Sequence, residues 1–164
     1  MNQKPVFYPP TKEDGWAVSQ LISDCPPLDT NSAYCNLLQC HHFASTSVAV
    51  RLENELVGFI SGYLIPEKPD TLFVWQVAVS DKARGHGIAA QMIDHILNRD
   101  NCQSVRFIDT TITETNEASW ALFGRVAKNY NASLEREDLF TKNEHFSGQH
   151  DTEILVTIGP LTRD

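Results

Sequence analysis

The chain has 164 residues, 41% of them hydrophobic and 21% charged, which is enough for one domain with its own hydrophobic core. Its formal net charge of -8 excludes a protein that binds nucleic acid through bulk positive charge, because such proteins cluster Lys and Arg. An acidic surface suits a cationic substrate better. We therefore expect a single domain over residues 1–164 and no nucleic-acid partner.

No apolar run approaches the roughly 20 residues that cross a bilayer, and the N-terminus lacks the positive-then-apolar layout of a secretory signal. We expect a cytoplasmic protein with no membrane partner. The four cysteines are expected to be reduced thiols, and their spacing fits no common zinc pattern, so we expect no metal.

Two helices are predicted in the first quarter of the chain, before any clear strand. Thr11 and Asp14 resemble a capping box, and apolar residues then recur at helical spacing as far as Pro26-Pro27. Residues 28–32 offer several N-cap candidates for a second helix, which has Tyr34 on its apolar face.

Strands are predicted over residues 46–52 and 56–65, which are rich in β-branched and aromatic residues and form a hairpin. Gly58 and Gly62 indicate a bulge or the close approach of another backbone. Residues 66–70 are predicted to be a loop.

A third strand over residues 72–79 breaks at Ser80-Asp81, and a helix begins at about Gly87. Residues 105–112 form another strand, so strand, helix and strand predict a βαβ crossover with two parallel strands. Asn116 is predicted to cap the next helix, and residues 132–140 and 152–158 are the last strands.

The turn between residues 80 and 89 has the chemistry of a diphosphate site. Glycines let the backbone approach a ligand closely, and the first N–H groups of a helix point outward with about half a positive charge. Lys82, Arg84 and His86 add basic groups to an otherwise acidic chain. The dinucleotide fingerprint and the phosphate-loop pattern are both absent.

Residues 84–89, Arg-Gly-His-Gly-Ile-Ala, resemble the Arg/Gln-x-x-Gly-x-Gly/Ala turn of the GNAT superfamily of N-acetyltransferases. The resemblance implies an α/β fold with a mixed, mostly antiparallel sheet flanked by helices, whose central parallel strand pair is joined by the βαβ crossover. It implies acetyl-coenzyme A as co-substrate. The cofactor-binding residues it implies are Val77, Ala78, Val79, Arg84, Gly85, His86, Gly87, Ile88, Ala89, Asn116 and Phe123.

The same resemblance implies a mechanism. The pantetheine arm would lie along residues 75–79 like an added strand, and the Val77 N–H would stabilise the oxyanion of the tetrahedral intermediate. Asn116 would contact the pantetheine region. Phe123 stands where many members of the superfamily have a tyrosine general acid, so the proton donor to the thiolate stays open.

A closer resemblance is to the L-2,4-diaminobutyrate acetyltransferase family, and it covers nearly the whole chain. It implies acetylation of the γ-amine of diaminobutyrate in the synthesis of ectoine, a compatible solute for osmoprotection, and it suggests a homodimer. The segments that carry it are residues 27–34, His41-His42-Phe43, Gly62-Tyr63, residues 72–79, and residues 110–113 before Asn116.

A diamino acid needs acids for its ammonium groups and donors for its carboxylate. The predicted substrate-binding residues are Asp29, Asn31, Tyr34, Trp75, Asp109 and Thr111, and Asp29 is also a predicted catalytic residue. Each has a structural alternative: a plain N-cap for Asp29, core packing for Trp75, and inter-strand hydrogen bonding for Asp109 and Thr111.

An alkylammonium must lose a proton before it attacks, and the general base stays open among Asp29, Asp109, His150 and Glu153. Only the intrinsic titration range of histidine side chains favours His150 among them. We expect direct transfer in a ternary complex, since no cysteine has a recognisable nucleophile setting. Two other functions remain open: acetylation of another small amine or a protein amine, and a non-catalytic acyl-coenzyme A sensor.

Overall fold

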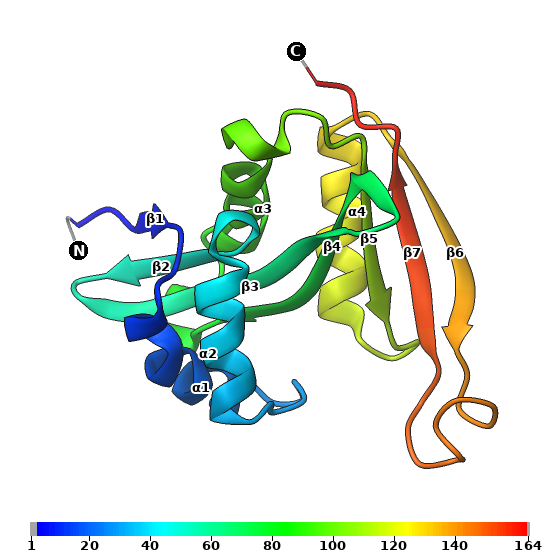
Figure 1. The fold of residues 1–164 in the computed structure, drawn as a ribbon, viewed down its shortest axis with the longest axis horizontal. Coiled ribbons are helices and arrows are strands. Elements are labelled where there is room, and N and C mark those ends of the chain that lie inside the picture. Colours follow the sequence, from blue (N-terminus) through cyan, green and yellow to red (C-terminus); the bar gives the residue numbers. More distant parts are fainter. Residues whose placement is uncertain (1–2, 164) are drawn as a thin grey trace. The chain divides into compact units, whose positions relative to one another are not determined.

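The computed structural model describes residues 3–163 (Figure 1). Its seven-stranded sheet has the strand order β1-β2-β3-β4-β5-β7-β6 and is mostly antiparallel, with β4 and β5 as the parallel pair. The predicted fold class is therefore confirmed. The strands are β1 (Val6–Tyr8), β2 (Val48–Leu52), β3 (Glu55–Ile65), β4 (Lys68–Val79), β5 (Phe107–Ile112), β6 (Ser133–Phe140) and β7 (Glu153–Gly159), and the α-helices are α1 (Gly15–Ser23), α2 (Ala33–His42), α3 (Ile88–Leu97) and α4 (Glu117–Asn129).

The chain forms two compact units. The first unit comprises residues up to Leu64 together with Val74–Ser104, and the second comprises Ile65–Phe73 together with the residues from Val105 onward. Strand β4 contributes its first part to the second unit and its last part to the first. That residues 1–164 act as a single domain stays a prediction.

The core of the first unit lies between α1, α2 and the strands beneath them. Val18, Leu21 and Ile22 of α1 pack with Ala49, Phe59 and Ala78 from three strands. Helix α3 buries Ile88, Met92, Ile93, Ile96 and Leu97, which is the stripe that a 3.6-residue period produces.

Gly58 allows α3 to approach the sheet. A Cβ at this position would lie 3.2 Å from the Cβ of Val50 and 3.3 Å from the Sδ of Met92. The register between β2 and β3 also shifts at Val50/Arg51. The register shift next to Gly58 confirms the predicted bulge, whereas the atoms that approach its Cβ position belong to side chains and not to another backbone.

The ends of the first helices follow the predicted capping chemistry. The Asp14 carboxylate accepts a 2.8 Å hydrogen bond from the Thr11 N–H, within a short 3-10 helix that leads into α1. Ser32 is the N-cap of α2, and its hydroxyl accepts from the Cys35 N–H at 3.0 Å.

Two predictions about the strands were wrong. Strand β1 precedes both helices and pairs antiparallel with β2, but its three residues are too few to show an alternating pattern. The predicted loop over residues 66–70 is shorter, because β4 begins at Lys68. Pro69 is tolerated there because it lies at the start of the strand.

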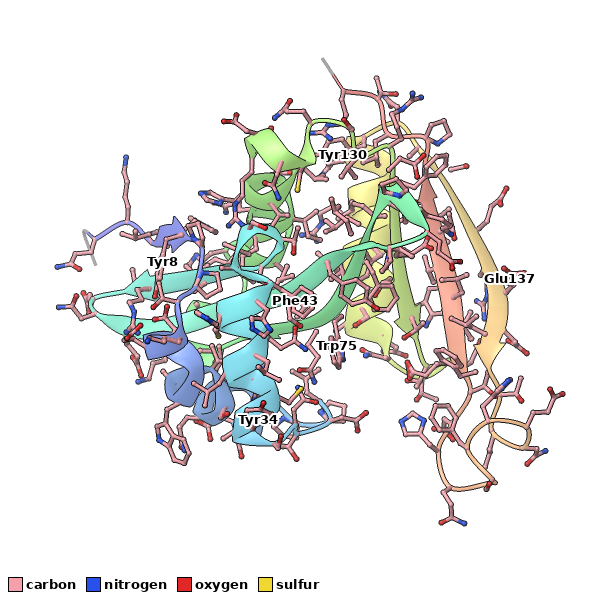
Figure 2. All side chains as sticks on the ribbon, viewed as in Figure 1. Tyr8, Tyr34, Phe43, Trp75, Tyr130 and Glu137 are labelled. Atoms are coloured by element: carbon pink, nitrogen blue, oxygen red, sulfur yellow. The ribbon has the colours of Figure 1, made fainter. Side chains whose placement is uncertain are left out.

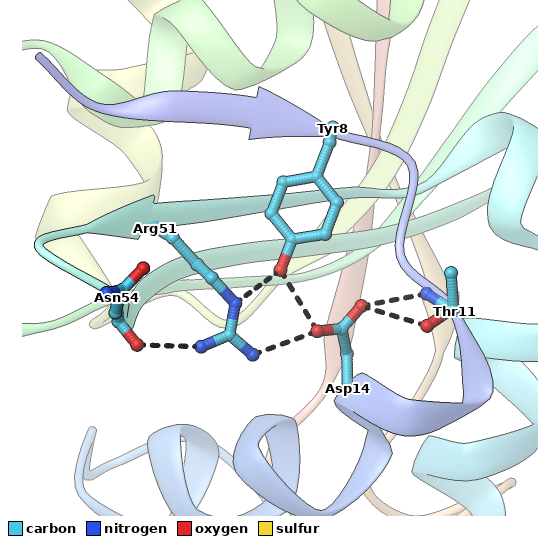
Figure 3. A network of polar contacts seen from close by, with 5 residues as sticks. All are labelled: Tyr8, Thr11, Asp14, Arg51 and Asn54. Atoms are coloured by element: carbon cyan, nitrogen blue, oxygen red, sulfur yellow. Dashed lines mark hydrogen bonds and ion pairs between the residues drawn. The ribbon is translucent and has the colours of Figure 1, made fainter.

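A polar network ties β1 to the start of α1 and to β2 (Figure 3). Arg51 donates from Nε to the Tyr8 hydroxyl at 2.7 Å and pairs with Asp14 Oδ1 at 3.0 Å, and the Tyr8 hydroxyl donates to the same oxygen at 3.0 Å. Burial would raise the pKa of the Asp14 carboxyl, but the hydrogen bonds from its neighbours outweigh burial, and the net pKa is lowered.

In the second unit, β7 pairs antiparallel with both β5 and β6. The N–H of Arg106, the residue before β5, donates to the carbonyl of Asp70 in the first part of β4 at 2.8 Å. Asn116 is the N-cap of α4, as predicted, and its Oδ1 accepts a hydrogen bond from the Ser119 N–H at 3.2 Å.

All four cysteines are free thiols, as expected. Over residues 3–163, no helix has the length and apolar character needed to cross a membrane. Within the same described residues, no three His, Cys, Asp or Glu side chains are grouped to hold a metal ion.

Candidate active site

The turn between β4 and α3 has the backbone geometry that the sequence predicted. Gly85 has φ 84° and Gly87 has φ 71°, in the left-handed region that favours glycine. Gly87 is the N-cap of α3, and no atom lies within 4 Å of a Cβ built on Gly85. The first N–H groups of α3 have no partner within the helix, so this turn can hold a diphosphate.

The basic side chains of the turn differ in how they are held. Arg84 donates from Nε to the Val79 carbonyl at 3.2 Å and forms an ion pair with Asp81. The ammonium of Lys82 pairs with Glu55 at 2.9 Å, so an acid partly balances its charge. The hydrogen bond to the Val79 carbonyl therefore holds the Arg84 side chain at the end of β4.

The last part of β4 alternates between buried and exposed residues. Val74, Gln76 and Ala78 are buried, whereas Trp75 is 44% exposed and Val77 and Val79 are half-buried. Consecutive residues of a strand point to opposite faces. The face of β4 with Val74, Gln76 and Ala78 is therefore covered, and the face with Trp75, Val77 and Val79 is partly open. Val77, whose N–H is the predicted oxyanion donor, directly follows the buried Gln76.

The segment that holds Asp29 and Asn31 is bonded to β4. Gln76 Nε2 donates to the Asp29 carbonyl at 2.7 Å, and Asn31 Nδ2 donates to Gln76 Oε1 at 2.8 Å. Ser32 is the N-cap of α2, so the alternative role of Asp29 as that N-cap was wrong. Tyr34 is 70% exposed on the first turn of α2.

Three aromatic side chains of the first unit form a row of ring contacts, and Figure 2 labels the two at its ends, Phe43 and Trp75. Tyr63 lies between Phe43, at a ring-centroid distance of 5.9 Å, and Trp75, at 6.5 Å with the two rings nearly perpendicular. Burial raises the pKa of the Tyr63 hydroxyl. The exposure of Trp75 argues against the core-packing alternative and leaves its indole accessible to a ligand.

Asp109 and Thr111 lie on β5 in the second unit. Asp109 is buried, and its Oδ2 accepts from Lys68 Nζ at 3.2 Å while Oδ1 has no hydrogen-bond partner. The Thr111 hydroxyl donates to Glu153 Oε1 on the neighbouring strand β7 at 3.0 Å. Thr111 therefore makes the inter-strand hydrogen bond that was the alternative to a substrate contact. The same bond places Glu153, a candidate general base, beside Thr111, a predicted substrate residue.

Asn116 and Phe123 also belong to the second unit. Asn116 caps α4, whereas Phe123 is 2% exposed and is part of the core. Their contacts with a cofactor stay predictions.

The first unit contains an open pocket of about 550 Å³ beside the start of the turn. Its wall includes Trp16 and Asp24 on the α1 side and Ser80 and Lys82 on the turn side. None of the predicted cofactor or substrate residues lines it.

Gln76, Tyr63 and Phe43 were not predicted to be site residues. Gln76 is a buried amide within a Val-rich strand, and only its position between Trp75 and Val77 points to it. Tyr63 and Phe43 stand in segments that carry the resemblance, which was the one available signal.

Residues 15–127 match the family described as Acetyltransferase (GNAT) family. The chain belongs to the GNAT acetyltransferase family. The resemblance of the turn at residues 84–89 is thereby confirmed, and acetyl-coenzyme A is the co-substrate that this family uses.

Two relatives of this GNAT protein are named L-2,4-diaminobutyric acid acetyltransferase. That of Methylotuvimicrobium alcaliphilum is 56% identical over 93% of this chain and 88% of its own length. That of Vibrio parahaemolyticus is 46% identical over 96% of this chain and 87% of its own length. The closer resemblance is also confirmed.

A similar solved structure is the diaminobutyrate acetyltransferase EctA from Paenibacillus lautus, in complex with its substrate L-2,4-diaminobutyric acid and coenzyme A. It has a TM-score of 0.93 and 37% sequence identity, and the match covers 99% of each chain. The arrangement of strands and helices in this GNAT protein is thus that of an acetyltransferase.

Proposed function

We propose that this protein transfers the acetyl group of acetyl-coenzyme A to the γ-amine of L-2,4-diaminobutyrate. The observation that carries the proposal is the 56% identity over 93% of the chain to a diaminobutyrate acetyltransferase. The geometry of the turn supports the donor half, because two glycines with positive φ lead into the N-terminus of α3.

The donor half uses the first unit. The diphosphate binds the N–H groups of residues 85–89 and the guanidinium of Arg84, with His86, Gly87, Ile88 and Ala89 shaping the turn. The pantetheine arm runs along Val77, Ala78 and Val79, and the Val77 N–H donates to the acetyl oxygen as negative charge develops on it.

The acceptor is recognised by charge and by aromatic surface. Asp29 pairs with an ammonium group, Asn31 and Tyr34 supply hydrogen bonds, and Trp75 offers its indole face to the amine. Asp109 and Thr111 are proposed to add polar contacts. The exposure of Tyr34 and Trp75 supports this assignment, since a ligand can reach both.

Transfer is direct in a ternary complex. The neutral γ-nitrogen attacks the thioester carbon, a C–N bond forms, the C–S bond breaks, and coenzyme A leaves as the thiolate. A base must take the amine proton. Among the four candidates we propose Glu153. Asp29 is assigned to an ammonium group of the substrate, Asp109 is paired with Lys68, and His150 Nδ1 lies 2.6 Å from a backbone carbonyl. Glu153 accepts a hydrogen bond from Thr111, which orients its carboxylate.

Thiol release from acetyl-coenzyme A with a panel of amines tests the proposal. We expect release with diaminobutyrate at a kcat/KM well above that with ornithine, lysine, putrescine or a lysine peptide. Equal rates with another amine would favour a different acceptor. No release with any amine, despite binding of acetyl-coenzyme A, would favour the sensor.

We further propose a cytoplasmic homodimer whose product enters ectoine synthesis and thereby osmoprotection. Exposed apolar side chains on α1 and α2, namely Trp16 and Leu37, support the dimer. Light scattering of the purified protein measures its mass. Growth of a deletion strain at high salt, with and without added ectoine, tests the cellular role.

A further inference from the structure

Gln76 uses both ends of its side-chain amide to hold one short segment. Its Nε2 donates to the Asp29 carbonyl at 2.7 Å, and its Oε1 accepts from Asn31 Nδ2 at 2.8 Å. Gln76 is 8% exposed. A buried amide with both functions satisfied fixes its partners, because losing either bond leaves a polar group unpaired.

The hydrogen bonds continue from this segment into α2 and α1. Asn31 Nδ2 also donates to Asn36 Oδ1 at 3.1 Å, and Asn36 Nδ2 donates to Ser19 Oγ at 2.8 Å. Asn36 is 1% exposed. The four side chains form a partly buried polar chain from β4 through the segment at residues 29–31 to α2 and α1, in which Gln76 and Asn36 are the buried members.

Gln76 connects this chain of hydrogen bonds to the part of β4 that we propose to bind both substrates. Its neighbours on β4 are Trp75, the proposed amine wall, and Val77, the proposed oxyanion donor. One side chain therefore sets the distance between the strand that places the acetyl group and the segment that carries Asp29. A misplacement of about 1 Å can cost about a hundredfold in rate.

We infer that Gln76 is a positioning residue that sets which acceptor chain length is accepted. This inference rests on the proposed function, because diaminobutyrate and ornithine differ by one methylene between the amines. With Gln76 in place, Asp29 and Val77 are held at a spacing that suits the shorter diamine. Without the Gln76 amide, the segment that carries Asp29 moves, and the enzyme discriminates less strongly against ornithine, the longer diamine.

The test compares Gln76→Met, which keeps the side-chain volume and removes both hydrogen bonds, with Ser19→Ala, which breaks only the far end of the same polar chain. We expect Gln76→Met to raise KM for diaminobutyrate about tenfold or more and to lower the preference over ornithine. KM for acetyl-coenzyme A should stay within about twofold. Ser19→Ala should leave both KM values and the preference unchanged.

Hydrogen exchange provides a readout that does not depend on turnover. Amides of residues 28–34 should exchange faster in Gln76→Met and at the native rate in Ser19→Ala. If Gln76→Met does not fold, Gln76→Glu replaces it, since its Oε can still accept from Asn31 but cannot donate to Asp29. Unchanged exchange and an unchanged diamine preference would overturn the inference, whereas a wild-type protein inactive on diaminobutyrate would count against the proposed function.

Discussion

The hydroxyl of Thr111 donates a 3.0 Å hydrogen bond to the carboxylate of Glu153. The bond orients the carboxylate that we propose as the general base. Replacing Glu153 with Gln should therefore lower kcat by about 10²–10⁴-fold, because the amide cannot accept the amine proton. KM for acetyl-coenzyme A should change little.

Glu137→Gln is the matched control, since Glu137 is an exposed carboxylate on β6 of the same unit and should leave kcat unchanged. Steady-state kinetics over a range of pH measures both variants. If Glu153→Gln keeps wild-type kcat at every pH, Glu153 is not the base.

The glycine turn allows a matched pair of backbone variants. Gly85 and Gly148 have φ of 84° and 76°, and neither has an atom within 4 Å of an added Cβ. Alanine costs about 1–2 kcal/mol in this backbone region at both positions. Only Gly85→Ala should raise KM for acetyl-coenzyme A, by about five- to tenfold, because only that turn is proposed to hold the diphosphate.

Titration with acetyl-coenzyme A and kinetic measurement of KM check this prediction. Gly148→Ala corrects for the general cost of the substitution. Equal effects of the two variants on KM would show that the turn at residue 85 does not bind the cofactor.

The network around Asp14 predicts a pH-dependent stability. Asp14→Asn should lower the free energy of unfolding at pH 7 by about 2–3 kcal/mol, because hydrogen bonds to a charged group are lost. The pKa of Asp14 is lowered in the folded protein, below an unfolded value of about 3.9. The stabilisation is therefore fully present above about pH 4 and is lost as the pH falls through the folded pKa.

Urea unfolding of both proteins at pH 7, 4 and 3 measures the difference. The difference in the free energy of unfolding between wild type and Asp14→Asn should become smaller toward pH 3. Tyr8→Phe, which removes one partner of the carboxylate, should cost less, about 1 kcal/mol. If this difference in the free energy of unfolding stays constant down to pH 3, the charge of the Asp14 carboxylate does not contribute to stability.

The resemblance of the sequence to the superfamily implies that Phe123 stands where many members have a tyrosine, but its side chain is 2% exposed. Phe123→Tyr should therefore lower the free energy of unfolding by about 1–3 kcal/mol, because the hydroxyl would be buried without a partner. It should not raise kcat. Thermal unfolding and kinetics check both parts, and a faster enzyme of unchanged stability would show that a hydroxyl here reaches the thiolate.

The turn at residues 84–89 could be predicted because its signal is local: a strand, glycines that adopt positive φ, and an amphipathic helix follow one another in sequence. The cap at Asn116 was predictable for the same reason. Strand β1 was not, since three residues exist as a strand only through pairing with β2. A long-range contact of that kind leaves no periodicity in the sequence.

The acceptor side was harder to predict for a related reason. Spacing alone made Asp29 an N-cap candidate, and only the fold shows that Ser32 fills that role. Gln76 reads as one more strand residue, because its two partners are 47 and 45 positions away in the chain. Side-chain hydrogen bonds across such separations depend on tertiary packing.

The central claim is tested most directly by the product. The purified protein is incubated with acetyl-coenzyme A and L-2,4-diaminobutyrate, and the product is examined by mass spectrometry and NMR. We predict one added acetyl group, with the chemical-shift change at the γ-methylene. Acetylation at the α-nitrogen, or no acetylated diaminobutyrate while another amine is consumed, would contradict it.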